Sequence, residues 1–199
     1  GHNMPGTKVS GYDYIPAEEA YNILRTNIQF CGVVNKIKTI TVTSCDPGEG
    51  KTTISFNLAK SMAKAELKTL IVDTDLRKPN VAKMAGIDLE NEAAGTIKGI
   101  TDFISGDCGI DDIIYTTPVK NLFIIPCGTI PPNPAELLGT EKFTRFIEDA
   151  KTRLFKVVKG QFDMIIFDSP PLRSVIDAAV LAAKTDGTLL VVRTGAVNY

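Results

Sequence analysis

The sequence predicts a parallel α/β fold, in which a central sheet is covered by helices on both faces. Several apolar segments are continuous runs rather than alternating patterns, which is typical of strands buried on both faces. Segments with helical periodicity separate these runs along the chain, as expected for an α/β architecture. Polar or glycine-rich residues follow the runs at 44–53, 73–78 and 168–171, and in such sheets ligands bind at the carboxyl ends of the strands.

The predicted elements follow one another in a regular order. An amphipathic helix is expected over residues 17–30, where Ala20, Ile23, Leu24 and Ile28 recur at helical spacing. Strands are expected at 37–43, 69–72, 122–125, 164–167 and 189–192. Helices are expected at 51–65, 142–158 and 175–183, with short helical pieces and glycine turns over 80–118. Residues 1–16 are interpreted as a tag remnant and a polar N-terminal arm, and residues 17–199 as one domain.

Composition narrows the range of functions. A chain of 199 residues suits one domain with one core, and its formal net charge of −1 gives no general attraction to nucleic acid. No apolar run approaches the roughly 20 residues that cross a bilayer. The four cysteines are scattered, which fits a reducing cytoplasm and argues against a zinc site. The sole histidine, His2, lies in the tag remnant, so histidine-based catalysis is not expected.

The segment 44–53 carries the signature of a phosphate-binding loop between a strand and a helix. The general pattern is G-x-x-x-x-G-K-[ST], and here Cys45 replaces the first glycine while Gly50-Lys51-Thr52 is intact. The loop N–H groups and the helix N-terminus would surround phosphate oxygens, Lys51 would reach the β- and γ-phosphates, and Thr52 would bind Mg²⁺. A glycine turn that only caps a helix is the alternative. The predicted nucleotide-binding residues are Asp46, Pro47, Gly48, Glu49, Gly50, Lys51, Thr52 and Thr53.

Aspartates follow two of the predicted strands. Asp168 comes directly after 164–167, the usual place of the Mg²⁺-side carboxylate in phosphate-loop proteins. Asp73 and Asp75 stand at i and i+2, which in an extended chain point the same way. Such a pair can hold a cation beside the phosphates, or one member can accept a proton from a hydroxyl nucleophile. The alternative is that these residues only cap helices or form solvated turns.

From about residue 17 to its end, the chain resembles the bacterial tyrosine kinases (BY-kinases) that regulate capsule and exopolysaccharide export. The stretches at 75–79 and 131–138 are more specific to this family than the phosphate loop is. The matching stretches are Glu18-Glu19-Ala20-Tyr21 through Leu24-Arg25-Thr26-Asn27-Ile28, Pro47-Gly48-Glu49-Gly50-Lys51-Thr52, Val72-Asp73-Thr74-Asp75-Leu76-Arg77-Lys78-Pro79, Pro131-Pro132-Asn133-Pro134-Ala135-Glu136-Leu137-Leu138 and Phe167-Asp168-Ser169-Pro170-Pro171.

The resemblance implies a protein-tyrosine (auto)kinase that uses ATP and Mg²⁺. Lys51, Asp73 and Asp75 would be its catalytic residues, with Asp73 accepting the proton of the acceptor tyrosine. Thr52, Asp75 and Asp168 would lie on the metal side. Family members phosphorylate a tyrosine cluster at their own C-terminus, in trans, within a ring. In the Gram-positive type the kinase is cytoplasmic, and the cytoplasmic segment of a membrane activator of the polysaccharide co-polymerase type recruits it to the inner face of the plasma membrane.

The chain departs from the family in two places. The ring-forming helix of the family carries Glu-x-x-Arg-x-x-Arg, and here Asn22 stands between Glu19 and Arg25 in place of the middle arginine. Glu19 and Arg25 are the implied oligomer interface, but a bidentate donor is missing, so the sequence does not predict whether a ring forms. An ordinary exposed helix face is the alternative for this pair. The chain also stops at Tyr199 without a tyrosine cluster, so we expect a C-terminal truncation.

Two other functions are compatible with the predicted fold. A MinD/ParA-type ATPase switch would have the same architecture, but those proteins carry a second lysine early in the loop, where this chain has Asp46 followed by Pro47. A nucleotide-binding module with weak or lost kinase activity is favoured by Asn22 and the missing tail. The complete set of phosphate-loop and acidic residues argues against that module.

Overall fold

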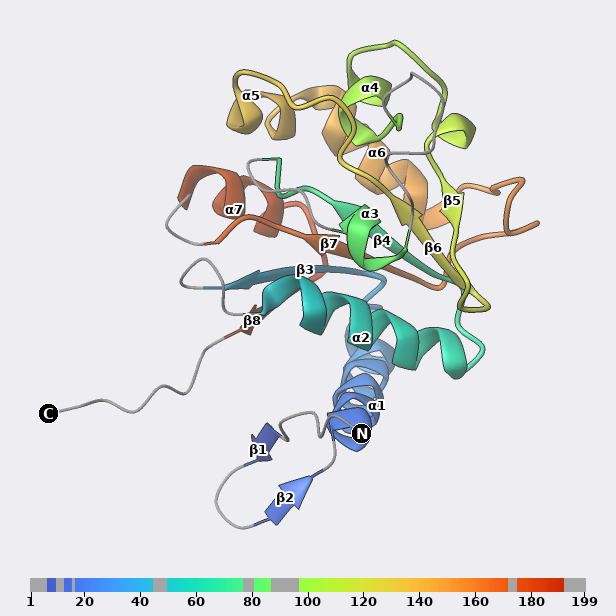
Figure 1. The fold of residues 1–199 in the computed structure, drawn as a ribbon, viewed down its shortest axis with the longest axis vertical. Coiled ribbons are helices and arrows are strands. Elements are labelled where there is room, and N and C mark those ends of the chain that lie inside the picture. The colour runs from blue at the N-terminus through green and yellow to red at the C-terminus, as the bar shows by residue number, and fades with distance from the viewer. Residues whose placement is uncertain are drawn as a thin grey trace, which may run out of the picture.

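A mostly parallel sheet forms the centre of the molecule (Figure 1). The computed structural model describes residues 7–9, 13–15, 17–44, 50–76, 81–86, 97–171 and 175–191. Within these residues the main sheet has six strands in the order β5-β6-β4-β7-β3-β8. Only the short β5 runs antiparallel to its neighbour. The strands are β3 (Thr39–Ser44), β4 (Thr69–Asp73), β5 (Tyr115–Thr116), β6 (Leu122–Ile125), β7 (Met164–Asp168) and β8 (Gly187–Val191).

Helices cover both faces of this sheet, as the continuous apolar runs predicted. In β4, Leu70 and Val72 pack into one core cluster with α6, while Ile71 packs into the other with α2. Figure 1 shows α1 and α2 on one side of the sheet and α4 to α7 on the other, and α3 packs into the same core cluster as α2. The helices are α1 (Ala17–Asn35), α2 (Lys51–Lys64), α3 (Val81–Met84), α4 (Ile100–Ile104), the 3₁₀ helix η1 (Ile110–Asp112), α5 (Pro134–Leu138), α6 (Glu141–Thr152) and α7 (Val175–Ala182).

The predicted strands agree with the structure to within two residues at each end. The helix predicted at 142–158 was wrong at its C-terminal end, because α6 stops at Thr152. Arg153 is extended, with φ −67° and ψ 142°, and the chain turns back so that Phe155 and Gly160 form an antiparallel bridge. This turn buries Phe155 against Phe162, with ring centroids 5.0 Å apart. Burial of an aromatic ring therefore outweighs helix continuation here.

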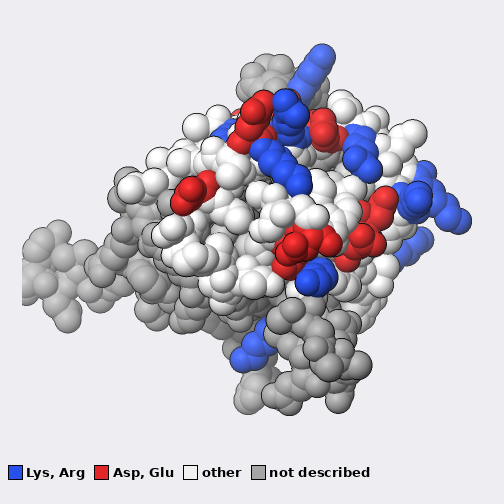
Figure 2. Space-filling model, turned by 90° about the horizontal axis from the view of Figure 1, so that it is seen from above, with Lys and Arg blue, Asp and Glu red and all other residues white. Residues whose placement is uncertain are grey.

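The predicted N-terminal arm contains a small hairpin, in which β1 (Thr7–Val9) pairs antiparallel with β2 (Asp13–Ile15). Among the described helices, none has both the length and the hydrophobicity needed to span a bilayer. Figure 2 looks down on the side of the molecule that carries α4 to α6. Lys and Arg side chains are interspersed there with Asp and Glu, so the visible described surface has charges of both signs rather than one large field.

Candidate active site

The candidate site lies where β3, β4 and β7 end side by side. Within the parallel ladder, Asp73 of β4 stands opposite Asp168 of β7, and Asp168 stands opposite Val42 of β3. β3 ends at Ser44, directly before the phosphate-loop residues 45–49. Because carboxyl ends of parallel strands meet at one edge, the topology brings Lys51 and Thr52 together with Asp168, as the sequence predicted.

Helix α2 begins at Lys51, directly behind the loop. Gly50 precedes it in a left-handed conformation, with φ 75° and ψ 19°, which glycine adopts at little cost. Gly50 has no side chain to cap the helix, and the N–H groups at the start of a helix are a place where an anion can bind. The predicted residues Lys51, Thr52 and Thr53 form the first turn of α2. The predicted residues Asp46, Pro47, Gly48 and Glu49 lie outside the described residues.

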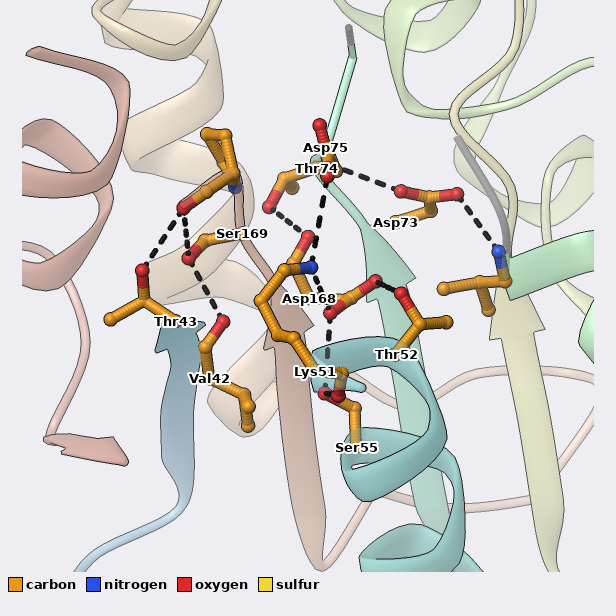
Figure 3. Close-up of polar contacts among 12 residues, drawn as sticks. Val42, Thr43, Lys51, Thr52, Ser55, Asp73, Thr74, Asp75, Asp168 and Ser169 are labelled. Atoms are coloured by element: carbon orange, nitrogen blue, oxygen red, sulfur yellow. Dashed lines mark hydrogen bonds and ion pairs between the residues drawn. The ribbon is translucent and has the colours of Figure 1, made fainter. Parts of the chain in front are cut away.

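Lys51 and Thr52 both bond directly to the buried Asp168, and Thr52 itself is partly exposed (Figure 3). The Lys51 Nζ atom lies 2.6 Å from Asp168 Oδ1 and 3.7 Å from Asp75 Oδ2. The Thr52 hydroxyl donates to Asp168 Oδ2 at 2.8 Å. Lys51 is 7% exposed and Asp168 is fully buried. One ammonium group thus contacts two carboxylates, and carboxylates are the kind of group that a hard divalent cation binds.

Asp73 faces a different direction from Asp75. The Asp73 carboxylate accepts the N–H of Asp75 at 3.1 Å and the N–H of Val81 at 3.2 Å. Figure 3 shows the two side chains turned to different sides, with Asp75 toward Lys51 and Asp73 away from it. The expectation that both carboxylates point the same way is wrong, because β4 ends at Asp73 and a side-chain-stabilised turn replaces extended backbone. The role of Asp73 as a base stays a prediction.

Three buried hydroxyl residues at this edge were missed by the sequence analysis. Ser55 donates to Asp168 Oδ1 at 3.2 Å and to the Lys51 carbonyl at 3.0 Å. Its position one helical turn after Lys51 is a signal that could have found it. Thr74 and Ser169 each follow a strand-end aspartate and bond to the neighbouring strand. Ser and Thr are too common near strand ends for that position alone to have identified these two.

The loop after β6 lies near the acidic residues, because Cys127 in this loop is within reach of the charges of Asp73 and Asp75. Asp102 fastens this loop, because its carboxylate accepts the Gly99 N–H at 2.9 Å and the Thr129 hydroxyl at 2.8 Å. Burial raises the pKa of the Cys127 thiol to about 12, and the negative charges of Asp73, Asp102 and Asp75 contribute in the same direction. Cys127 therefore stays a neutral thiol at physiological pH and is unsuited to act as a nucleophile.

The predicted oligomer residues lie on α1, away from the carboxylates. Glu19 is exposed, while Arg25 contacts the chain's own α2, where its Nη1 atom donates to the Ser61 carbonyl at 3.2 Å. The Ser61 hydroxyl donates in turn to Asn22 Oδ1 at 2.6 Å. Asn22 thus joins α1 to α2 within one chain. Whether Glu19 and Arg25 also meet a second chain stays a prediction.

The side chains present suit a hard divalent cation that is shared with a ligand. In the described part of the chain, no three His, Cys, Asp or Glu residues are grouped closely enough to hold a metal by themselves. The Thr52 hydroxyl and the carboxylates of Asp75 and Asp168 offer only oxygen atoms. Mg²⁺ is characteristically bound by one or two carboxylates together with phosphates and water, so this donor set fits Mg²⁺ better than zinc.

Known proteins share both the sequence and the architecture. A family model described as an AAA domain matches residues 37–197. The tyrosine-protein kinase CpsD of Streptococcus agalactiae is 44% identical over 184 residues, which cover 92% of this chain and 73% of the relative. The kinase domain of Escherichia coli tyrosine kinase ETK superposes with a TM-score of 0.77 at 28% identity, covering 92% of this chain and 66% of that one.

The cell-division ATPases are more distant. MinD of Pyrococcus horikoshii, solved with Mg-ADP, has a TM-score of 0.57 at 27% identity and covers 77% of this chain and 57% of its own. The shared sheet therefore extends to MinD, while the greater coverage and identity lie with the tyrosine kinases.

Proposed function

We propose that this chain, which belongs to the bacterial tyrosine-protein kinases of the capsule and exopolysaccharide type, transfers the γ-phosphoryl group of Mg·ATP to tyrosine hydroxyls through the site at the ends of β3, β4 and β7. The observation that carries the proposal is the contact of the buried Asp168 with both Lys51 and Thr52, two side chains of the phosphate-loop motif, with Asp75 on the same lysine. Family membership makes the chain an ATP-binding enzyme.

Lys51 and the first turn of α2 would hold the triphosphate. Phosphoryl transfer needs little covalent participation by protein, so most of the catalysis comes from positioning and from stabilisation of charge on the transferred group. The Lys51 ammonium is already held at the strand ends by two carboxylates, 2.6 and 3.7 Å away. The ammonium group would therefore reach the β- and γ-phosphates by exchanging one of these partners, without the ordering of a mobile side chain.

Thr52, Asp75 and Asp168 would hold Mg²⁺ on the phosphate side. When bound, Mg²⁺ would neutralise negative charge on the β- and γ-phosphates. Asp168 contributes a carboxylate that is fully buried, and Ser55 holds its Oδ1 atom by a hydrogen bond. Such support keeps a metal-side carboxylate in one orientation, which lowers the reorganisation needed when the ion arrives.

Asp73 would receive the proton of the acceptor phenol. In this step the phenol oxygen bonds to the γ-phosphorus, the bond from that phosphorus to the ADP oxygen breaks, and the phenol proton passes to a carboxylate oxygen of Asp73. The contacts of Asp73 with the N–H groups of Asp75 and Val81 hold the carboxylate in place for this step. General-base catalysis of this kind contributes about 10²- to 10⁴-fold.

The family resemblance further supports a membrane-bound partner. A polysaccharide co-polymerase-type activator would bind the kinase through its cytoplasmic segment and recruit it from the cytoplasm to the inner face of the plasma membrane. Self-association would use α1, where Glu19 is exposed. Asn22 and Arg25 are already bonded to Ser61, so an interface through Arg25 would have to accommodate that contact.

The test is phosphotyrosine formation by the full-length native protein, mixed with the activator's cytoplasmic segment and Mg·ATP and followed by intact mass. We expect phosphate on tyrosines in the wild type, and a loss of about 100-fold or more in Asp73→Asn with ATP binding retained. Equal transfer by Asp73→Asn would remove Asp73 from the mechanism. ATP hydrolysis without phosphotyrosine would instead favour the switch-ATPase function.

A further inference from the structure

A row of buried hydroxyl groups connects the strand ends that form the site. We define the hydroxyl row as Thr74 at the end of β4, Ser169 at the end of β7 and Thr43 near the end of β3. All three residues are at most 3% exposed. None of them has a role in binding ATP or in transferring phosphate in the proposed mechanism. Each of them is nevertheless within one or two residues of a side chain or loop that has such a role.

Thr74 donates twice to one atom. Its main-chain N–H and its hydroxyl both reach the main-chain carbonyl oxygen of Asp168, each at 2.9 Å. The N–H bond continues the ladder between β4 and β7 by one residue, and the hydroxyl adds a second bond to the same acceptor. The end of β4 is therefore fastened to Asp168 more firmly than backbone pairing alone would achieve.

Ser169 repeats this pattern on the next strand. Its N–H donates to the Val42 carbonyl at 3.0 Å and its hydroxyl donates to the same oxygen at 2.9 Å. The Thr43 hydroxyl then donates back to the Pro170 carbonyl at 3.0 Å. The row thus joins β4 to β7 and β7 to β3, and β3 leads directly into the phosphate loop (Figure 3).

The placement of Thr74 connects the two carboxylates proposed for the metal side. Thr74 is the residue between Asp73 and Asp75, and its acceptor is the main chain of Asp168 itself. A change in the Thr74 contact would shift Asp75 relative to Asp168, which share Lys51 at 3.7 and 2.6 Å. A cation held by both carboxylates requires a fixed separation, because Mg²⁺ demands near-ideal octahedral geometry.

We propose that Thr74 is a positioning residue, whose hydroxyl sets Asp75 against Asp168 for Mg·ATP through their shared main-chain link, with Ser169 extending the same function toward the phosphate loop. This inference rests on the proposed function, since it concerns the same site. Thr74 touches neither ATP nor tyrosine in this mechanism, so its removal should alter the Mg²⁺ requirement and turnover more than the affinity for ATP at saturating Mg²⁺.

The experiment compares Thr74→Val, which keeps the shape and removes the hydroxyl, with Thr74→Ser, which keeps the hydroxyl. Thr41→Val is the matched control, because Thr41 is also fully buried in the sheet and its hydroxyl bonds only to the Thr185 hydroxyl, at 2.7 Å, in the described structure. Ser169→Ala is the second variant, for use if Thr74→Val folds poorly. Phosphotyrosine formation and binding of a fluorescent ATP analogue are each measured across a Mg²⁺ titration, and thermal unfolding is followed for every protein.

We expect Thr74→Val to need about five- to tenfold more Mg²⁺ and to lose kcat by a similar factor, as the loss of one hydrogen bond of ordinary strength implies. Thr74→Ser and Thr41→Val should match the wild type in both respects, although Thr41→Val should unfold at a lower temperature. Ser169→Ala should change the Mg²⁺ requirement in the same direction as Thr74→Val.

If Thr74→Val and Thr41→Val lose stability equally and share the wild-type Mg²⁺ dependence, Thr74 is only a structural residue and the inference fails. If the wild type binds Mg·ATP but forms no phosphotyrosine, the kinase proposal fails by itself. In that case a raised Mg²⁺ requirement for nucleotide binding in Thr74→Val still supports the positioning role, and an unchanged requirement overturns it.

Discussion

The central sheet has an edge where its parallel strands begin and an opposite edge where they end. Both edges contain a lysine with aspartates, but the charges are arranged in opposite ways. At the edge where the parallel strands begin, Lys151 and Asp186 form a pair whose side chains are 22% and 24% exposed. Asp186 also accepts the N–H groups of Lys38 and Thr39, at 2.9 and 3.0 Å, so its charge is matched by local donors. At the opposite edge, Lys51 is shared between two carboxylates that are nearly or fully buried.

This difference indicates that the charges around Asp186 stabilise the fold, whereas those around Asp168 serve the reaction. Around Asp186 the charged groups bond to the chain where strands begin, and they remain partly exposed, so the cost of removing them from water is modest. Around Asp168 one ammonium group and two carboxylates are held together in a place where desolvation is expensive, and such a buried arrangement is weak evidence for stability. Substitutions at the first edge should therefore affect unfolding, and substitutions at the second should affect activity.

The largest effect is expected for Lys51→Met, compared with Lys151→Met as the matched substitution at the other edge. Removing the Lys51 ammonium takes away charge stabilisation of the transferred phosphoryl group, so phosphotyrosine formation should fall by about 100-fold or more. Lys151→Met should keep wild-type activity at temperatures where it is folded. Phosphotyrosine formation by both variants is measured by intact mass after incubation with Mg·ATP. A comparable loss of phosphotyrosine in the two variants would contradict the proposed difference between the edges.

A smaller effect is expected for Ser55→Ala. Its hydroxyl bonds to Asp168 Oδ1, and the loss of one such bond should reduce kcat by about five- to tenfold through a less fixed carboxylate. Ser61→Ala is the control, because Ser61 lies on the same helix and its hydroxyl bonds to Asn22 instead. Steady-state kinetics decides the point: a fall in Ser61→Ala as large as in Ser55→Ala would mean that α2 as a whole, rather than Asp168, had been disturbed.

Asp186→Asn should destabilise the fold by about 1 kcal/mol without changing turnover. Burial by itself would raise the pKa of Asp186, but the N–H groups of Lys38 and Thr39 and the Lys151 ammonium lower it below its ordinary value of 3.8. A lowered folded-state pKa gives stability that is present above pH 3.8 and is lost as the pH falls through the folded-state pKa. Urea unfolding should therefore separate the wild type from Asp186→Asn at pH 7, and the gap should close in strong acid. A gap that persists there would point to packing instead of charge.

The smallest effect is expected for Glu141→Gln on the surface of α6. Glu141 pairs with Arg145 at 2.8 Å, but the two side chains are 79% and 73% exposed, so water and salt screen the interaction. The free energy of unfolding should stay within about 0.5 kcal/mol of the wild type. A larger loss in urea unfolding would show that exposure alone does not rank the charged pairs of this chain.

Much of the framework could be predicted because it depends on patterns local to the sequence. Continuous apolar runs identified the strands, and the phosphate-loop signature located Lys51 and Thr52 at the start of a helix. Asp168 was placed correctly beside them, since a carboxylate at the end of a parallel strand must lie near the same edge. The membership of the tyrosine-kinase family was also correctly anticipated from the acidic and proline-rich stretches.

The parts that could not be predicted depend on contacts between distant segments. The direction of the Asp73 side chain is decided by the N–H of Val81, which begins another helix. The end of α6 is decided by the burial of Phe155 against Phe162. Thr74 matters only because it reaches Asp168, 94 residues later in the chain. Sequence patterns indicate periodicity and local turns, but they do not indicate which hydroxyl group donates a hydrogen bond to which distant carbonyl oxygen.

The order of the strands has a consequence for how the chain is made. β3 emerges early in synthesis, yet its partners in the sheet are β7 and β8, at Met164–Asp168 and Gly187–Val191. Until those residues leave the ribosome, the β-branched strand Thr39–Ser44 lacks both of the neighbours that it has in the described sheet, and it is open to aggregation. Long-range parallel strands of this kind pair slowly, because the entropy cost of closing a long loop comes before the favourable contacts form. The contact between Lys51 and Asp168 therefore cannot form until the ribosome has made the 117 residues that follow Lys51, so nucleotide can assist folding only after that point.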